Sequence, residues 1–224
     1  MKILLFAVCL VLSNIIIGQD CNYYFLQDNK TIEQTFKNKK GKETGKQVYT
    51  ISNVSKSGTA TTGTVNSEFF SDKGKSISKA TNNVKCVAGV LMMDMKLFIP
   101  SAQQEQMGTA TATASDVYLE YPVNMNEGDA LKDGQFSMDY KSTSGMSGSV
   151  SVNITERKVL GKESVTTPAG TWDCFKISSN QKMNIKISGI SIPVKADVIE
   201  WFAPGFGVIK SDANGATAEI TSIK

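Results

Sequence analysis

The sequence predicts an all-β protein, an antiparallel meander that closes into a barrel, a half-barrel or a sandwich, with at most one or two short helices. Apolar residues recur with a period of two along nearly the whole chain, and Thr, Val, Ile and aromatic residues dominate those runs. Turn signals separate the runs, and Asn214-Gly215 is a strong two-residue hairpin signal. Meanders of this kind bury one face by closing on themselves or by packing two sheets.

The alternation places strands, in chain order, at Thr31–Lys37, Gln47–Lys56, Thr59–Phe70, Lys85–Met95, Asp116–Tyr121, Gln135–Tyr140, Ser147–Arg157, Thr171–Ser178, Met183–Ile192, Val194–Phe202, Gly207–Lys210 and Thr217–Ile223. The lysine-rich run 37–46 surrounds two glycines and predicts a solvated hairpin loop between the first two strands. Pro100 and Ser101 can open a helix, which we expect over Gln103–Met107.

The first 18 residues have the layout of a secretory signal peptide. Lys2 supplies a positive charge, and a run of 15 mostly apolar residues follows from Ile3 to Ile17. This run is shorter than the roughly 20 residues that a membrane-spanning helix needs, and no second run of that length follows. We therefore expect cleavage after Gly18 or Gln19 and no transmembrane segment.

The remaining residues, 19–224, are expected to form a single exported β domain that is soluble in the periplasm or outside the cell. Roughly 205 residues are enough to bury a sizeable core, and no linker divides them. Removing the signal peptide leaves Cys21, Cys86 and Cys174, so at most one intramolecular disulfide can form. All three pairings are open, with a preference for Cys21–Cys86, which would fasten the mature N-terminus to the body.

The composition excludes several classes of function. Histidine is absent from the entire chain, which removes serine–histidine–aspartate and cysteine–histidine catalysis and the usual histidine-based zinc and iron sites. The net charge falls from +3 to +2 when Lys2 is removed, and no basic stripe with interleaved aromatic residues is present. We expect no metal, no cofactor and no nucleic-acid partner.

Two segments carry a resemblance to a known family. RKVLGKESVTTPAGTWDCFKI and, further along, EWFAPGFGVIKSD resemble the exported TapB-like proteins, relatives of a broader group defined only as a domain of unknown function. Similarity extends to QDCNYYF, FFSDKGK and EGDALKDG and covers most of the mature chain. The resemblance implies an exported, largely antiparallel β fold without an established activity. The positions that match the family pattern are Pro168, Ala169, Gly170, Thr171, Trp172, Cys174, Trp201, Phe202, Ala203, Gly205, Gly207 and Val208.

The first segment predicts a turn that enters a strand at Thr171. Pro168 fixes its φ and lacks a backbone donor, while Gly170 can adopt a positive φ. Trp172 and Cys174 share one face of the strand that follows. Because the chain has no histidine to serve as a base, we interpret Cys174 as a buried or disulfide-bonded residue and not as a nucleophile.

The second segment combines Trp201 with Gly205 and Gly207. This glycine spacing evokes a nucleotide-binding loop, but such a loop must open a helix, whereas VIKSDANG continues as a strand. We predict a bulge or a close approach of two backbones here. Trp201 and Trp172 are then expected to be aromatic residues of the core or of a cavity wall.

Arg157 is the only arginine beside 23 lysines. A guanidinium in a chain that otherwise uses lysine suits a bidentate contact, and Glu163 and Asp173 are the candidate partners. Retention on the surface by chance is an equal alternative.

The function predicted from these observations is non-enzymatic: a protein that binds an apolar or lipid ligand, or an envelope protein, in a concave sheet. The missing histidine, the family resemblance and the methionine-rich stretch VLMMDMKLF motivate it, although methionines also fill gaps in ordinary β cores. The alternative is a carboxylate-dependent hydrolase acting on envelope glycans, with Asp94, Glu120 or Glu200 as candidate acids. Nothing in their spacing selects a pair.

Overall fold

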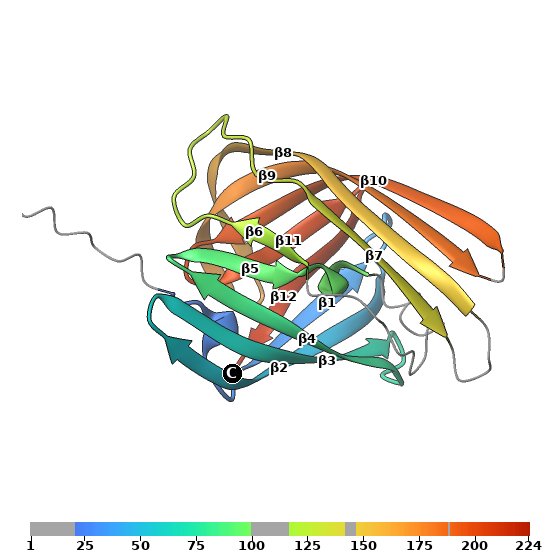
Figure 1. The fold of residues 1–224 in the computed structure, drawn as a ribbon, viewed down its shortest axis with the longest axis horizontal. Coiled ribbons are helices and arrows are strands. Elements are labelled where there is room, and N and C mark those ends of the chain that lie inside the picture. The colour runs from blue at the N-terminus through green and yellow to red at the C-terminus, as the bar shows by residue number, and fades with distance from the viewer. Residues whose placement is uncertain (1–20, 100–116, 142–146, 188) are drawn as a thin grey trace, which may run out of the picture.

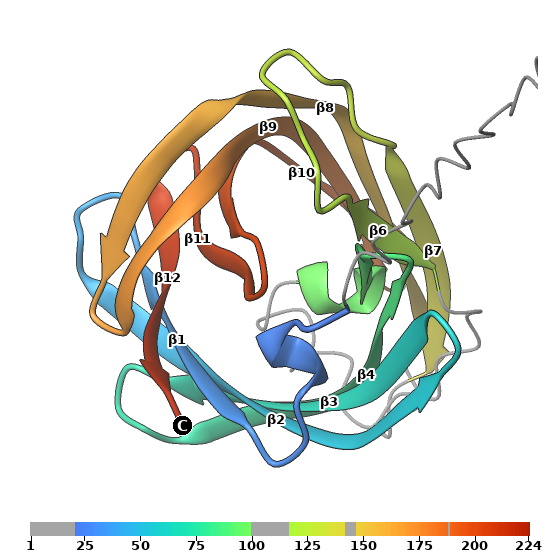
Figure 2. The ribbon, with the colours of Figure 1, turned by 90° about the vertical axis from the view of Figure 1, so that its left-hand side faces the viewer.

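One antiparallel sheet rolls into a nearly closed barrel in the computed structural model, which describes residues 21–99, 117–141, 147–187 and 189–224 (Figures 1 and 2). The barrel is one of the three architectures predicted from the sequence, and the all-β class is confirmed. The elements in chain order are η1 (Tyr24–Leu26), β1 (Thr31–Lys37), β2 (Glu43–Ser57), β3 (Ala60–Ser71), β4 (Ser76–Val87), β5 (Val90–Asp94), η2 (Met95–Phe98), β6 (Tyr118–Tyr121), β7 (Gly134–Lys141), β8 (Ser147–Thr167), β9 (Gly170–Ile187), β10 (Ile190–Ala203), β11 (Gly207–Ala213) and β12 (Ala216–Ile223).

The strand order is β6-β5-β4-β3-β2-β1-β12-β11-β10-β9-β8-β7. Each strand except the pair β6 and β7 is bonded to its neighbour in sequence, and β1 also pairs with β12, so the first and last strands meet inside the sheet. The two edge strands, β6 and β7, are consecutive in the chain, and the sheet ladder stops between them. The barrel therefore has one seam, between β6 and β7, and the segment that joins these strands makes backbone hydrogen bonds to β8, such as Leu131 N–H to the Arg157 carbonyl at 2.8 Å.

Local turn chemistry sets most of the hairpins. Asn214 (φ 53°) and Gly215 (φ 88°) form the turn between β11 and β12, as the sequence predicts. The lysine-rich loop joins β1 to β2, and the side-chain oxygen of Asn38 accepts the backbone N–H groups of Lys40 and Lys42 at 2.9 and 3.1 Å.

Several strands differ in their bounds from those the pattern predicts. β8 runs to Thr167 and does not end at Arg157, β4 begins at Ser76, and the predicted strand Met183–Ile192 is divided between β9 and β10. The predicted strand Lys85–Met95 is two strands, because Ala88 (φ 49°) and Gly89 (φ 85°) make a tight turn within it. Strand β9 runs unbroken through 179–182, where polar residues interrupt the apolar alternation. The helix expected over Gln103–Met107 lies outside the described residues.

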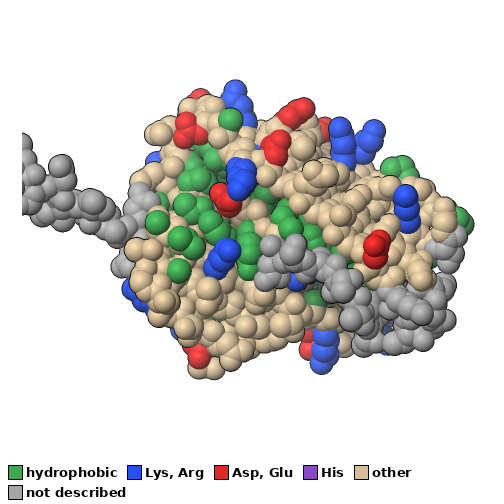
Figure 3. All heavy atoms as spheres, viewed as in Figure 1, with side chains coloured by type: hydrophobic (Ala, Val, Ile, Leu, Met, Phe, Trp, Pro, Cys, Tyr) green, Lys and Arg blue, Asp and Glu red, His purple; other side chains and the backbone are tan. Residues whose placement is uncertain are grey.

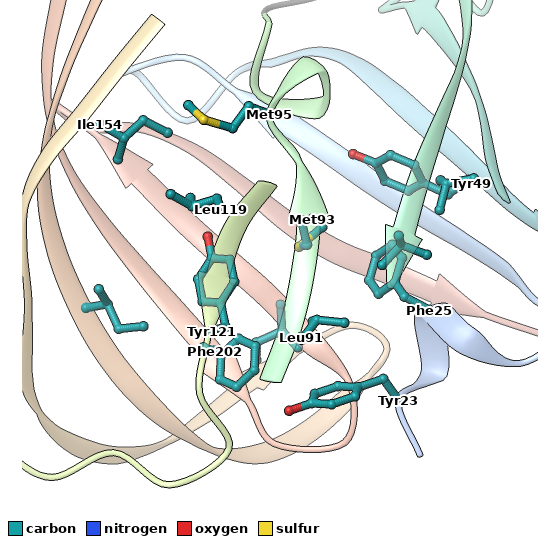
Figure 4. Close-up of a cluster of buried hydrophobic side chains, with 14 of the residues drawn as sticks. Tyr23, Phe25, Tyr49, Leu91, Met93, Met95, Leu119, Tyr121, Ile154 and Phe202 are labelled. Atoms are coloured by element: carbon teal, nitrogen blue, oxygen red, sulfur yellow. The ribbon is translucent and has the colours of Figure 1, made fainter. Parts of the chain in front are cut away.

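The core fills the barrel from the inward faces of the strands and from η1 and η2, which lie within the ring in Figure 2. Tyr23 and Phe25 enter it from the segment around η1, beside Leu91 and Met93 of β5 (Figure 4). A disulfide joins Cys21 to Cys86 and fastens this N-terminal segment to β4, which confirms the preferred pairing.

Cys174 is the remaining described cysteine, and it is free and buried. No helix among the described residues is both long and apolar enough to cross a membrane.

Candidate functional site

A cavity of about 240 Å³ lies inside the barrel. Its wall is mainly apolar and is built from β1, β2, β5, β9 to β12 and the two short helical turns. Phe25 of η1 and Phe98 of η2 contribute rings from within the barrel, and Ile220 of β12 contributes from the sheet. The polar side chains on the wall are those of Gln34, Gln47, Tyr49, Gln181, Glu200 and Ser211.

Glu200 is the carboxylate of this cavity. It lies on the inward face of β10, with only 3% of its surface exposed, and the Tyr121 hydroxyl donates a hydrogen bond of 3.0 Å to its Oε2. Burial raises the pKa of Glu200 above its ordinary value, while the positive charge of Arg157 and the Tyr121 hydrogen bond partly oppose that shift. The site therefore favours the protonated carboxyl more than an exposed glutamate would.

Tyr121 holds its position through its ring. The Tyr121 ring stacks on the Phe202 ring with 5.0 Å between their centroids (Figure 4). The guanidinium carbon of Arg157 lies 4.7 Å from the centroid of the Tyr121 ring. Burial is the largest cause that raises the pKa of Tyr121 well above its usual range, and the Glu200 charge adds to it. The hydroxyl therefore remains a donor toward Glu200.

Arg157 closes the seam of the barrel. Its Nη1 donates to the backbone oxygen of Glu120 in β6 at 2.9 Å and to that of Lys132, just before β7, at 2.8 Å. A register shift in β8 between Thr155 and Lys158, with Glu156 at φ 55°, accompanies the burial of this side chain.

The expected partners of Arg157 were wrong. The guanidinium bonds to backbone carbonyls and not to Glu163 or Asp173, and the residue is 1% exposed, so surface retention is also wrong. The sequence cannot reveal carbonyl partners, because every residue carries a carbonyl. Within the described chain its Nε and Nη2 donate to no protein acceptor.

The first two strands, β1 and β2, place a second polar group on the cavity wall. The Tyr49 hydroxyl lies 2.9 Å from Gln34 Oε1 and 3.1 Å from Gln47 Oε1. Burial raises the pKa of Tyr49, which keeps the phenol neutral. The sequence analysis did not identify this group or Gln181. The signal that could have revealed it is Gln47, a glutamine at an inward position of β2, among inward residues that are otherwise mostly apolar.

Of the three carboxylates considered for catalysis, the cavity contains only Glu200. Asp94 is fully buried, caps η2 by accepting the Lys96 backbone N–H at 3.0 Å, and pairs with Lys96 Nζ at 3.0 Å. Glu120 pairs with Lys132 at 2.6 Å beside the seam. The structure therefore does not bring two of these acids together on the cavity wall. Among the described residues, no group of three His, Cys, Asp or Glu side chains could hold a metal.

The Pro168 segment is a turn between β8 and β9. The Thr167 hydroxyl accepts the backbone N–H of Ala169 at 3.2 Å, and Gly170 follows with φ 150°. Trp172 is half-buried, and its ring centroid lies 5.6 Å from that of Phe206. Burial, with help from neighbouring carboxylates, raises the pKa of Cys174 to about 12, so the thiol carries no nucleophilic charge near neutral pH.

The Trp201 segment is also structural. The indole Nε1 donates to the Glu163 carboxylate, and Lys176 and Lys210 lie 5.6 and 5.3 Å from the ring centroid, so this half-buried ring belongs to a charged cluster and not to the cavity wall. The Trp201 hydrogen bond is the main cause that lowers the pKa of Glu163.

Gly205 and Gly207 have φ angles of 78° and 129°, and a Cβ on Gly207 would lie 3.2 Å from the Phe25 ring. The glycines thus allow the turn between β10 and β11 to approach η1, where the Gly205 carbonyl accepts the Tyr24 N–H at 2.8 Å.

The fold is shared with solved structures of bacterial proteins. A Bacteroides fragilis protein described as an inferred exported protein with a YmcC-like fold superposes with a TM-score of 0.73 at 22% identity, covering 91% of this chain and 100% of its own. An inferred lipoprotein from Parabacteroides distasonis gives a TM-score of 0.74 at 17% identity, covering 92% and 100%. No curated protein matches the chain. A family model described as DUF3108-like matches residues 27–223.

Proposed function

The chain belongs to the DUF3108-like family, and we propose that this member is a non-enzymatic exported protein that binds a small amphipathic molecule inside its barrel. The observation that carries the proposal is the cavity of about 240 Å³ with Glu200 on an otherwise mainly apolar wall. Small-molecule sites in proteins have this composition, an apolar lining with a few polar groups that fix orientation.

The size of the cavity limits the ligand. An apolar cavity of about 150 Å³ holds a benzene molecule, so about 240 Å³ suits a molecule or an acyl segment of roughly ten non-hydrogen atoms. Flexible Met93 on the wall suits an adaptable apolar fit. A whole phospholipid is too large, whereas a medium-length acyl chain with a small head group fits.

The polar groups limit the head group. The described lining residues include a carboxyl and three glutamine side chains but no lysine or arginine, so a phosphate or sulfate would have no cationic partner. A hydroxyl, an amide or a protonated acid can exchange hydrogen bonds with Glu200 and Gln181. The ligand proposed is therefore a neutral amphiphile with an apolar chain.

Export is part of the same proposal. The described disulfide Cys21–Cys86 suits an oxidising compartment, and the two structural neighbours are described as an exported protein and a lipoprotein. Within the DUF3108-like family, we also propose a kinship with the TapB-like proteins, on the residues from Pro168 to Cys174. An envelope protein that occupies the barrel is the competing partner.

Mass spectrometry of the protein purified gently from its own host tests the class of ligand, and titration with decanol tests the site. We expect a copurified neutral amphiphile, decanol binding to the emptied protein, and at least tenfold weaker binding by Ala218→Phe, which fills the cavity from β12. Glu68→Gln on the outside of β3 is the matched control and should bind normally. Empty protein that ignores decanol, or unchanged binding by Ala218→Phe, would refute the proposal.

A further inference from the structure

The β9–β10 hairpin exposes three large aliphatic side chains at its tip. Ile190, Ile192 and Val194 are 69, 46 and 43% exposed, and they are three of the four large hydrophobic residues exposed in the described chain. The hairpin projects past the end of β11 in Figure 1, and hydrophobic side chains reach the surface at that end of the molecule in Figure 3. Exposed aliphatic clusters at a protruding tip mark surfaces that bind something apolar.

The exposed face is continuous with the wall of the cavity. Even-numbered residues of β10 share one face, so Ile190, Ile192 and Val194 are followed on the same face by Val198 and Glu200, which line the cavity. At about 3.3 Å per residue, Val194 lies roughly 13 Å along the strand from Val198.

The neighbouring strand extends this face. The residues of β9 opposite the tip are also apolar, because Ile187 pairs with Ile190, Ile185 with Ile192, and Met183 with Val194. An apolar track of two strands therefore leads from the tip of the hairpin to the pair Met183–Val194, and the next pair on this face contains Gln181 of the cavity wall.

Positive charge flanks the tip. Lys182, Lys186 and Lys195 are exposed, and no acidic residue occurs between positions 182 and 196. In register across the sheet, the nearest carboxylate to Lys186 is that of Asp139, two strands away on β7 beyond Ser149. The lysines lie on the face of the hairpin opposite the aliphatic residues, because Lys182 and Lys186 pair with the odd-numbered residues Lys195 and Ser191 of β10. The two faces meet at the narrow tip, where positive charge near exposed aliphatic residues suits the surface of an anionic bilayer.

The edge of the hairpin disfavours the addition of a strand from another protein. β11 pairs with β10 only from Val198 onward, so the tip of β10 presents an edge on that side among the described residues. Pro193 lies in this edge and has no backbone donor, which is a common device against edge-to-edge pairing. Docking on a lipid surface does not require backbone hydrogen bonds to this edge, so Pro193 does not oppose it.

We propose that the β9–β10 tip docks on the surface of an anionic phospholipid bilayer, with Ile190, Ile192 and Val194 inserted between head groups and the lysines at the phosphates. The further step, in which a neutral amphiphile leaves the bilayer and follows the β9–β10 face into the cavity, rests on the proposed function.

Flotation with phosphatidylglycerol–phosphatidylethanolamine vesicles, and with phosphatidylcholine vesicles for comparison, tests the docking. We expect binding to the anionic vesicles and much weaker binding to the neutral ones. Ile190→Ser/Ile192→Ser should reduce binding at least tenfold, and Lys186→Gln/Lys195→Gln should reduce it by about fivefold per lysine. All of the variants have the same N-terminus, so any effect of the N-terminus on vesicle binding is the same in each.

Leu160→Ser is the matched control, because Leu160 is 41% exposed on β8 away from the hairpin tip, and it should bind as the unmodified protein does. If the double variant Ile190→Ser/Ile192→Ser does not fold, the single variant Ile190→Ser is tested in its place and should also bind the anionic vesicles more weakly. Equal binding of the Ile190 and Leu160 variants, or no binding to anionic vesicles, would overturn the docking proposal. Decanol titration without vesicles separates the two proposals, because the tip variants should keep that binding.

Discussion

Tyr121 and Glu200 form a hydrogen bond of 3.0 Å inside the barrel, although 79 positions separate them in the sequence. β6 is an edge strand and β10 lies three strands from the other edge, so the bond crosses the barrel interior. Arg157 lies against the same tyrosine ring and bonds to the backbone on both sides of the seam. The buried polar group at the cavity is thus linked to the contacts that close the sheet.

Glu200→Gln should remove a pH dependence of stability. Burial raises the pKa of Glu200 above its ordinary value of 4.5, so between that value and the folded-state pKa the folded protein binds more protons than the unfolded chain. The contribution of Glu200 to the free energy of unfolding is therefore largest at low pH. It falls as pH rises through that interval, by up to about 1.4 kcal/mol per pH unit.

Urea unfolding of both proteins from pH 4 to pH 8 measures this effect. The difference in unfolding free energy should grow in favour of Glu200→Gln as pH rises and then level off. Parallel curves for the two proteins would show that Glu200 titrates as an exposed carboxyl does.

Arg157→Met should weaken the seam. The change leaves the carbonyls of Glu120 and Lys132 without their donor and removes the cation near Glu200, which together should cost about 3 kcal/mol of unfolding free energy. Hydrogen exchange should accelerate first in β6 and β7. Lys132→Met, which removes only an exposed ion pair with Glu120, should cost less than about 1 kcal/mol. Equal losses in the two variants would contradict the role of Arg157.

Local patterns predict local structure well in this chain. β1 has the predicted bounds, Thr31–Lys37, because alternation and the flanking loop both mark it, and the turn at Asn214-Gly215 follows from residues that tolerate positive φ. The break within Lys85–Met95 was missed because Ala88 carries the positive φ ahead of Gly89, and alanine gives no such signal.

The candidate site could be predicted only in part. Glu200 was one of three candidate acids for a hydrolase, but the period of two assigns a residue to a face of its strand and not to a partner across a barrel. Tyr121 therefore could not be matched with Glu200. Trp201 was expected in the core or a cavity wall, and its half-buried ring packs against the core. Its partner Glu163 on β8, which accepts the indole N–H, could not be predicted because the pairing of distant strands sets that contact.

Reduction of the Cys21–Cys86 disulfide should destabilise the protein. The bond closes a loop of 65 positions, and the lost restriction of the unfolded chain corresponds to about 4 kcal/mol. The urea midpoint should therefore fall when a phosphine reductant is added. A Cys21→Ser/Cys86→Ser variant should start from the lower midpoint and not respond to the reductant. A midpoint that the reductant leaves unchanged in the unmodified protein would refute the stabilising role.

Cys174 should react slowly with a disulfide reagent while the protein is folded. Burial raises the pKa of its thiol to about 12, and Asp173 and Glu163 add smaller contributions, so the thiolate fraction at pH 8 is roughly a thousandth of that of an unperturbed cysteine. In protein processed at the expected cleavage site, Cys174 is the only free thiol, so the colour released by the reagent reports on it alone. The rate in the folded state should be at least a hundredfold below that in urea.

Glu163→Gln should change the folded rate only slightly, because burial is the main cause of the shift. Complete labelling of the folded protein within seconds would instead identify Cys174 as a reactive thiol and return it to the list of functional candidates.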